Sequence, residues 1–291
     1  MELQPASAGQ WRIPDNLWAQ IARLLPPERP HLKGGRPWIA ARAMMDGIFY
    51  VLRTGCQWKA LPRSYGAPST VHDRFQLWVQ AGVFGRLWQA GLCTYDQRVG
   101  IDWEWAAMDG AMTKAPLGGD CTGPNPTDRA KSGTKRSLLT EARGIPIGLA
   151  VAGANRHDMK LVEATLASIP IARPEPTLDD PQNLCLDKGY DYVAVRETVA
   201  AYGYTAHIRA RGEEATAKRD IPGYRARRWP VERTHSWMNR FRRLLIRWEK
   251  KIDNYLALLH FACAWIAFRV AGVLRPFASN IPRPRAQQVA G

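Results

Sequence analysis

Three acidic residues occupy positions from which carboxylates can act on phosphate esters. Asp109 and Asp187 each end a short apolar run that has the pattern of a strand, and Glu232 opens a helix-like segment. Cutting a phosphodiester requires charge stabilisation on the attacking and leaving oxygens, which two metal ions about 3.5 to 4 Å apart provide. Because Mg²⁺ prefers oxygen ligands and keeps several waters, three converging carboxylates suffice to hold such ions. The trio is therefore a candidate site for metal-assisted phosphodiester chemistry.

Each acid also has an ordinary structural interpretation. Asp109 precedes a glycine and Asp187 precedes a lysine and a glycine, which are common surroundings for a turn aspartate. Glu232 taken alone is simply a charge of the kind favoured at a helix N-terminus. A further acid, Asp158, is expected to cap a helix rather than to bind metal. The functional interpretation depends on the first three acids occurring together in a basic chain.

Arginines follow the glutamate in "ERTHSWMNRFRRL". Residues three or four apart share one helix face, so Arg233, Arg240 and Arg243 are predicted to form a stripe that holds DNA phosphates beside the acid. The opposing stripe, which is expected to pack on a sheet, comprises Trp237, Phe241 and Leu244. In this interpretation Glu232 supplies a metal ligand and the arginines hold the substrate.

The charge balance favours a polyanionic partner. The chain has 291 residues, with 41 Lys and Arg against 26 Asp and Glu, a net charge of +15, and its isoelectric point is near 10.0. More than half of this excess lies between His207 and Lys251. Such clustering is typical of a nucleic-acid-binding surface, although a solvated helical face would have the same composition.

The first part of the chain, residues 1–97, is predicted to be a helical DNA-binding domain. Asp15 can cap a first helix, a second is expected over residues 39–53, and Ser69 can cap a third that ends at Gly82. Helix, turn and capped helix are compatible with a helix-turn-helix, whose second helix lies in the DNA major groove. A plain three-helix bundle is the alternative. The residues expected to face DNA or solvent are His72, Asp73, Arg74 and Gln76.

In residues 98–276 the sequence pattern becomes typical of strands. A strand is expected to stop at Asp109, two strands flank a turn at Arg143 and Gly144, and a short strand ends at Asp187. Helices near 158–168 and 192–202 alternate with a strand at 204–210, and a basic and an apolar helix follow. This order predicts a mixed five-stranded α/β sheet flanked by helices. Residues 277–291 are expected to be a disordered tail.

Neither the cysteines nor the apolar stretch indicates export or membrane insertion. The five cysteines form no CxxC pair and no metal spacing, so they are expected to be reduced thiols in a cytoplasmic protein. No signal-peptide pattern occurs near the start. The stretch from Tyr255 to Leu274 is long enough for a membrane span but contains His260 and Arg269, which favours a buried or interface helix.

As a set, the motifs resemble those of bacterial insertion-sequence transposases of the DDE type, closest to the insertion-sequence-five group. The resemblance rests on "STVHDRFQLW", "MDGAMTKA", "KSGTKRSLLTEARGIPIGLAVAGANRHD", "LDKGYD" and "RRWPVERTHSWMNRFRRL", in this order. It implies an RNase H-like catalytic domain in which Asp109, Asp187 and Glu232 are the catalytic carboxylates and the metal ligands. It further implies two Mg²⁺ ions as cofactors, with Mn²⁺ as a substitute.

The family also has a tyrosine-arginine-glutamate-lysine signature around the glutamate. Arg228 matches its arginine, four residues before Glu232. Two positions depart from it, because Arg225 stands at the tyrosine position and Asn239 at the lysine position. Lys188, next to one of the aspartates, is a further candidate for DNA phosphate contact. The auxiliary contacts of the signature are therefore expected to differ in this chain.

The resemblance implies a nucleoid-associated enzyme that binds the terminal inverted repeats of its element, cuts the ends and joins them to target DNA. Synapsis of two ends implies a homodimer on DNA, and no membrane partner is expected. Two other functions fit the same residues: a nuclease of the same fold without strand transfer, and an inactive DNA-binding remnant or repressor.

Overall fold

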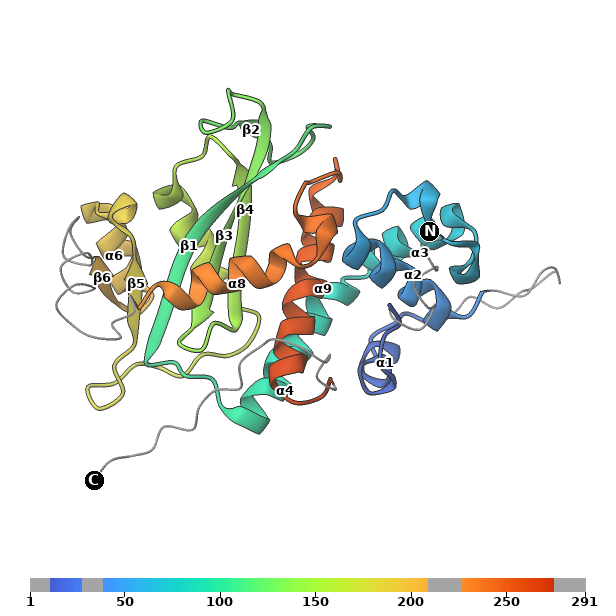
Figure 1. Cartoon of the computed structure of the whole chain (residues 1–291). Helices are drawn as coiled ribbons and strands as arrows, with labels where there is room; N and C mark the ends of the chain where they lie inside the picture. The colour runs from blue at the N-terminus through green and yellow to red at the C-terminus, as the bar shows by residue number, and fades with distance from the viewer. Residues whose placement is uncertain (1–10, 28–38, 209–226, 275–291) are drawn as a thin grey trace, which may run out of the picture.

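The N-terminal part of the protein is built from helices, drawn in blue to green in Figure 1. The computed structural model describes residues 11–27, 39–208 and 227–274. The N-terminal elements are α1 (Asp15–Ala22), α2 (Ala41–Thr54), the short 3-10 turns η1 (Trp58–Ala60) and η2 (Arg63–Tyr65), α3 (Pro68–Gln80) and α4 (Val83–Val99). The helical character predicted for this region is confirmed.

Both predicted helix caps in this region are wrong by one or two residues. Asp15 is the first helical residue of α1, behind the N-cap Pro14, and its side chain pairs with Arg42. Ser69 lies inside α3, which starts at Pro68. A proline is favoured at the first position of a helix, because the N–H that it lacks would have no partner there.

The central element is a mixed sheet. Its strands are β1 (Trp105–Lys114), β2 (Gly123–Pro124), β3 (Ser132–Glu141), β4 (Pro146–Gly153), β5 (Asn183–Leu186) and β6 (Thr205–Ile208). The strand order is β2-β3-β1-β5-β6, with β4 also paired to β3. The β1–β3 and β3–β4 pairs are antiparallel, whereas β1–β5 and β5–β6 are parallel. This is the mixed, RNase H-like arrangement that the sequence predicted, with the two-residue β2 as a sixth strand beyond the predicted five.

Helices cover both faces of the sheet. They are α5 (Val162–Ala167), preceded by the turn η3 (Asp158–Leu161), then α6 (Val193–Ala201) and α8 (Trp229–Asn239). Successive residues of a strand point to opposite faces. Ser137 of β3 accepts a hydrogen bond from Thr165 of α5 at 2.8 Å, whereas Arg136 donates to Asn239 at the end of α8 at 2.6 Å. Helices α5 and α8 therefore lie on opposite faces of β3.

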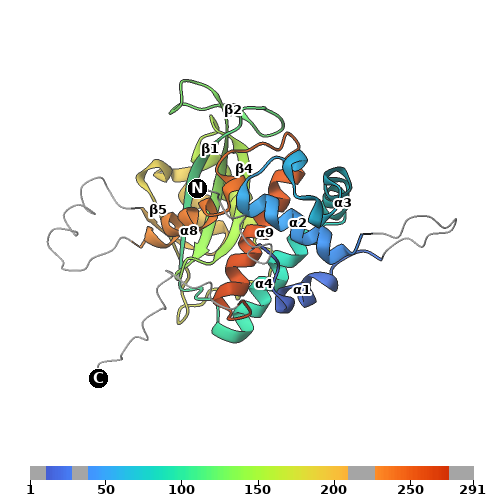
Figure 2. The ribbon, with the colours of Figure 1, turned by 45° about the vertical axis from the view of Figure 1, so that its right-hand side comes forward.

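The apolar stretch near the end of the chain forms α9 (Ile252–Val270), most of whose side chains are buried. It packs along α4, as Figures 1 and 2 both show. The predicted buried helix is thus confirmed, and the described residues contain no helix long and apolar enough to span a membrane. One hydrophobic core runs through the N-terminal helices, α9 and the sheet, across the boundary predicted at residue 97. The predicted tail, 277–291, lies outside the described residues.

Candidate active site

The first two acids meet at the point where β1 and β5 separate. Strand β5 pairs in parallel with β1 only as far as Ala107 and Cys185. Continuing this register by two residues sets Asp187 level with Asp109, just beyond the last paired residues. The expectation that β1 stops at Asp109 is wrong, because β1 continues to Lys114 along its other neighbour, β3. Asp109 is half-buried there, next to the end of β5 at Leu186.

The third acid belongs to α8. Glu232 lies in the first turn of this helix, where the helix dipole favours negative charge. Three side chains connect this end of α8 to the sheet. Arg233 donates a hydrogen bond to the carbonyl oxygen of Arg143, and the Thr234 hydroxyl donates one to the carbonyl oxygen of Gly144 at 2.5 Å. The His235 ring contacts the Asp109 carbonyl oxygen at 3.3 Å. The helix that carries Glu232 is therefore held directly over the strand that carries Asp109.

The electrostatics of Asp109 report the proximity of the other acids. Its pKa is raised to about 6, first because burial disfavours the charged form, and then because Asp187 and Glu232 repel it. The Gly110 backbone N–H and the Arg228 guanidinium act in the opposite direction. Burial also raises the pKa of the Tyr190 phenol, and the charges of Asp158, then Asp109 and Asp187, add to this effect. The acids therefore share one electrostatic environment, which a bound cation would relieve.

The carboxylates do not form a closed ligand cage as they are placed. Within the described part of the chain, no three His, Cys, Asp or Glu side chains are grouped closely enough to hold one ion. Asp187 accepts a hydrogen bond from the Gly189 backbone at 2.8 Å, and the half-exposed Glu232 lies 3.6 Å from Arg228. Sharing one ion with Asp109 would therefore require both Asp187 and Glu232 to change these contacts. Their oxygen donors fit a hard divalent cation.

Asp158 belongs to the other face of the sheet. A Cβ added to Gly110 would lie only 2.1 Å from the Oδ1 of Asp158. The Oδ2 of Asp158 pairs with Lys135 at 2.8 Å. Because Gly110 follows Asp109 on the strand, the two aspartates point to opposite faces. Asp158 is the first residue of η3 rather than its cap, a position that His157 holds. The expectation that Asp158 caps a helix is therefore wrong.

The predicted arginine stripe is broken, because α8 ends at Asn239 and the chain turns before the 3-10 helix η5 (Arg242–Leu244). Arg243 is buried, pairs with Glu249 at 2.7 Å and donates to the Cys56 carbonyl oxygen. Its predicted contact with DNA phosphate is thus contradicted by its own burial. Arg233 stacks on two tryptophans and Arg240 is exposed at the end of the helix.

The opposing stripe is also different from the prediction. Phe241 and Leu244 are buried but lie beyond the end of α8, and Trp237 is only partly buried. The α8 residues that pack on the sheet are Val231, Thr234, His235 and Met238. The prediction was wrong because it extended one helix through residue 244.

His235 and Arg136 are the residues of this site that sequence reasoning missed. Burial, followed by the charge of Arg136, lowers the pKa of His235 to about 3, so the ring is neutral at working pH. A neutral ring can donate from Nε2 to the Asp109 carbonyl oxygen. Arg136 is 2 % exposed and binds Asn239, the residue at the lysine position of the signature. The buried positive charge of Arg136 thus lies beside Asn239, where the signature has a lysine. The sequence held no local signal for either contact.

The remaining predicted DNA contacts lie at three places. Lys188 is exposed beside Asp187, and Arg228 is half-buried beside Glu232. On α3, Arg74 lies over the Trp78 ring, and His72 packs edge-on against Trp58 and contacts Gln76. These side chains lie on helix termini or on the partly exposed side of α3. Arg225 lies outside the described residues.

Gly144 determines how closely α8 approaches the sheet. It has φ +82°, and an added Cβ would lie 2.8 Å from the Arg233 guanidinium and 2.9 Å from the Thr234 hydroxyl. We expect Gly144→Ala to lower the free energy of unfolding by about 1 to 2 kcal/mol for the backbone conformation alone, with a further loss from these contacts. The measurement is urea denaturation.

Gly272→Ala is the matched control, since Gly272 has φ +74° and no atom within 4 Å of the added Cβ. Only the backbone contribution should appear in that variant. Equal losses in the two variants would show that α8 does not depend on the close approach at Gly144.

The order and directions of the strands place the protein in the RNase H-like class, whose enzymes act on phosphodiesters with divalent metal ions. Two segments match family models: residues 13–88 match "Putative transposase of IS4/5 family" and residues 106–267 match "Transposase DDE domain". Because the second match spans more than half of the chain, the chain belongs to the DDE transposase family, whose members are metal-dependent polynucleotidyl transferases that move DNA. The resemblance found in the sequence is confirmed.

Relatives of known sequence support this membership. The chain is 36% identical over 149 residues to a putative transposase for insertion sequence element IS402 of Burkholderia cepacia, a match that covers 50% of this chain and 68% of the relative. An uncharacterized 16.2 kDa protein of the same element is 36% identical over 118 residues, covering 39% of this chain and 80% of the relative. The Mos1 transposase catalytic domain solved with raltegravir and Mg has a TM-score of 0.29 at 12% identity, over 67% of this chain and 94% of that one.

Proposed function

We propose that the protein binds the terminal inverted repeats of its own element, cuts the element ends and joins them to target DNA. In this proposal Asp109, Asp187 and Glu232 hold two divalent ions, Mg²⁺ or Mn²⁺. The observation that supports it best is the convergence at the end of β5: the strand register brings Asp187 level with Asp109, and α8 carries Glu232 over the same strand.

The metal ions, when bound, stabilise the charge on the attacking and leaving oxygens of the phosphodiester. The protein itself positions the carboxylates and the DNA. Thr234 and His235 hold α8 on β1 and on the β3–β4 turn, so that Glu232 stays on the Asp109 side of the sheet. Arg228 and Lys188 lie beside the acids, where their charges can hold a DNA phosphate in line.

The reaction proceeds in two displacements at phosphorus. Water attacks the phosphodiester at the element end, the P–O bond to the terminal 3′ oxygen breaks, and a free 3′-hydroxyl results. This hydroxyl then attacks a phosphodiester of the target, forming one P–O bond as another breaks. The number of phosphodiester bonds is conserved in the second step, so no cofactor supplies energy for it.

Recognition of the repeats is assigned to the N-terminal helices, in particular to α3. Arg74 and the neighbouring exposed Asp73 lie on the side of α3 that faces away from the core. A recognition helix with one apolar and one polar side is the arrangement used to read a major groove. Joining two ends in one event requires two copies of the chain, so we propose a homodimer assembled on DNA.

The test is cleavage and joining of a labelled duplex that carries the flanking element end, with Mg²⁺, with Mn²⁺ or with EDTA. We expect metal-dependent nicking at the end of the element and joined products when target DNA is present. A scrambled end of equal length serves as the control and should remain intact.

Each other outcome points to another function. Cleavage without joined products would indicate a nuclease, and end-specific binding without cleavage under any metal condition would indicate an inactive remnant or repressor. Equal cleavage of the scrambled end would overturn the assignment of repeat recognition.

A further inference from the structure

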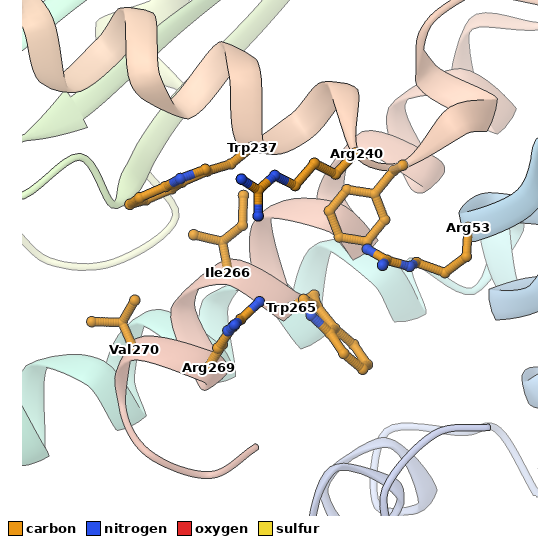
Figure 3. A pocket seen from close by; sticks show the side chains of 8 residues that line it. Arg53, Trp237, Arg240, Trp265, Ile266, Arg269 and Val270 are labelled. Atoms are coloured by element: carbon orange, nitrogen blue, oxygen red, sulfur yellow. The ribbon is translucent and has the colours of Figure 1, made fainter. Parts of the chain in front are cut away.

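A small pocket lies where the end of α2, the end of α8 and the last turns of α9 meet (Figure 3). Its cavity is about 40 Å³ and is lined by three arginines, Arg53, Arg240 and Arg269, together with aromatic side chains that include Trp237 and Trp265. One water requires about 10 to 15 Å³ of such space. The pocket therefore has room for a compact group of a few heavy atoms but not for a drug-sized ligand.

The three guanidinium groups converge without a counter-charge. Within the described part of the chain, no carboxylate lines the pocket or forms an ion pair with these arginines. The Nε of Arg53 is buried and makes no hydrogen bond, while its guanidinium lies over the Trp11 and Phe241 rings at 5.3 and 4.9 Å. An unpaired cluster of this kind is normally completed by an anion.

The charges of the cluster act on one another. The pKa of Arg53 is lowered first by burial and then by Arg269 and Arg240, and that of Arg269 is lowered by burial and by Arg240. An anion in the pocket would remove this repulsion. Arginine binds the oxygens of phosphate with paired N–H groups, and three forks around a 40 Å³ space match one tetrahedral group.

We propose that this pocket is a binding site for one backbone phosphate of DNA. The assignment to DNA rests on the proposed function and on position, because Arg240 directly follows the helix that carries Glu232. Arg240 lies eight positions after Glu232, which corresponds to about 12 Å along the helix axis. Both side chains are exposed on α8 or at its end. A strand whose scissile phosphate lies at the acids would present a later phosphate to the arginines.

The site also joins the two halves of the protein. Arg53 comes from the last turn of α2 in the helical part, whereas Arg240 and Arg269 come from the helices that follow the sheet. One phosphate bound by all three would fix the recognition helices relative to the active site. DNA binding at this point would then determine the distance between the bound repeat and the cleaved bond.

The test measures the salt dependence of DNA binding for Arg269→Gln. Each phosphate neutralised on B-DNA contributes about 0.9 to the slope of log affinity against log salt concentration. We expect the variant to bind about tenfold more weakly at low salt and to have a slope smaller by about 0.9. Arg53→Gln provides a second variant from the other half of the pocket, and thermal unfolding of both checks that they are folded.

Arg196→Gln is the matched control. It removes one positive charge from an exposed pair with Asp191 on α6, far along the chain from the pocket. This variant should keep the wild-type slope. Equal slopes for Arg269→Gln, Arg53→Gln and Arg196→Gln would overturn the phosphate site.

A scan of the element end with single neutral methylphosphonates locates the phosphate. One position should weaken wild-type binding about tenfold and weaken Arg269→Gln binding clearly less, and the absence of any such position would overturn the inference. The two proposals fail separately. Normal end cleavage with no arginine-dependent position would leave the function intact, whereas an arginine-dependent slope on DNA that is never cut would leave the pocket intact.

Discussion

Cleavage of an element end should fall by about a thousandfold when Asp109 is replaced by Asn. The amide keeps the shape of the side chain but loses the charge that a divalent ion requires. Charge stabilisation by metal is worth several kcal/mol, and about 4 kcal/mol corresponds to three factors of ten in rate. The measurement is single-turnover cleavage with saturating Mg²⁺, alongside the Kd for the same DNA, which should change little because the arginines and the lysine assigned to phosphate contact are unchanged.

The free energy of unfolding of Asp109→Asn should not fall with its cleavage rate. The pKa of Asp109 is raised to about 6 in the folded protein, above the value of about 3.9 in an unfolded chain. The folded state therefore binds this proton more tightly, and above pH 6 the ionised carboxylate opposes folding. Removing it should leave the free energy of unfolding at pH 8 unchanged or higher in the absence of metal. Loss of cleavage without loss of stability separates a catalytic role from a structural one.

Asp158→Asn is the control for both measurements. Asp158 lies against Gly110, one residue along the strand, but on the other face of the sheet. Its replacement breaks the pair with the mostly buried Lys135, so stability should fall while cleavage survives. Cleavage by Asp109→Asn within tenfold of the wild type, or an equal loss in Asp158→Asn, would mean that the wrong aspartate was assigned.

The sequence predicted the elements of the site because their signals are local. An apolar run before Asp187 marks β5, and Pro230 marks the first turn of α8 two residues before Glu232. The mixed sheet followed from the order of these elements. The register that sets Asp187 level with Asp109 is a long-range property, and no pattern within either strand specifies it.

The errors arose where local rules compete with tertiary contacts. The arginine stripe assumed one continuous helix, but the segment after Asn239 contains neither glycine nor proline to mark the end of α8. The chain turns there because Phe241 and Leu244 are buried in the core and Arg243 meets Glu249. Likewise, the contact between His235 and Asp109 depends on the docking of α8, which becomes visible only in three dimensions.

Replacement of Glu249 by Gln should cost about 3 to 5 kcal/mol in the free energy of unfolding. Glu249 and Arg243 pair at 2.7 Å with side chains only 3% and 6% exposed. Removing one partner of a buried ion pair leaves the other charge without compensation. Arg243 also donates to the Cys56 carbonyl oxygen just after α2, so the helical part and η5 should loosen together. Urea denaturation at pH 7 measures the loss.

Asp15→Asn tests whether burial, rather than ion pairing as such, causes the effect. Asp15 pairs with Arg42, but their side chains are 85% and 38% exposed. Water screens such a pair, so this variant should lose less than about 1 kcal/mol. Similar losses in the two variants would contradict the argument. A small loss in Glu249→Gln would also mean that Arg243 is not held in its buried position by this pair.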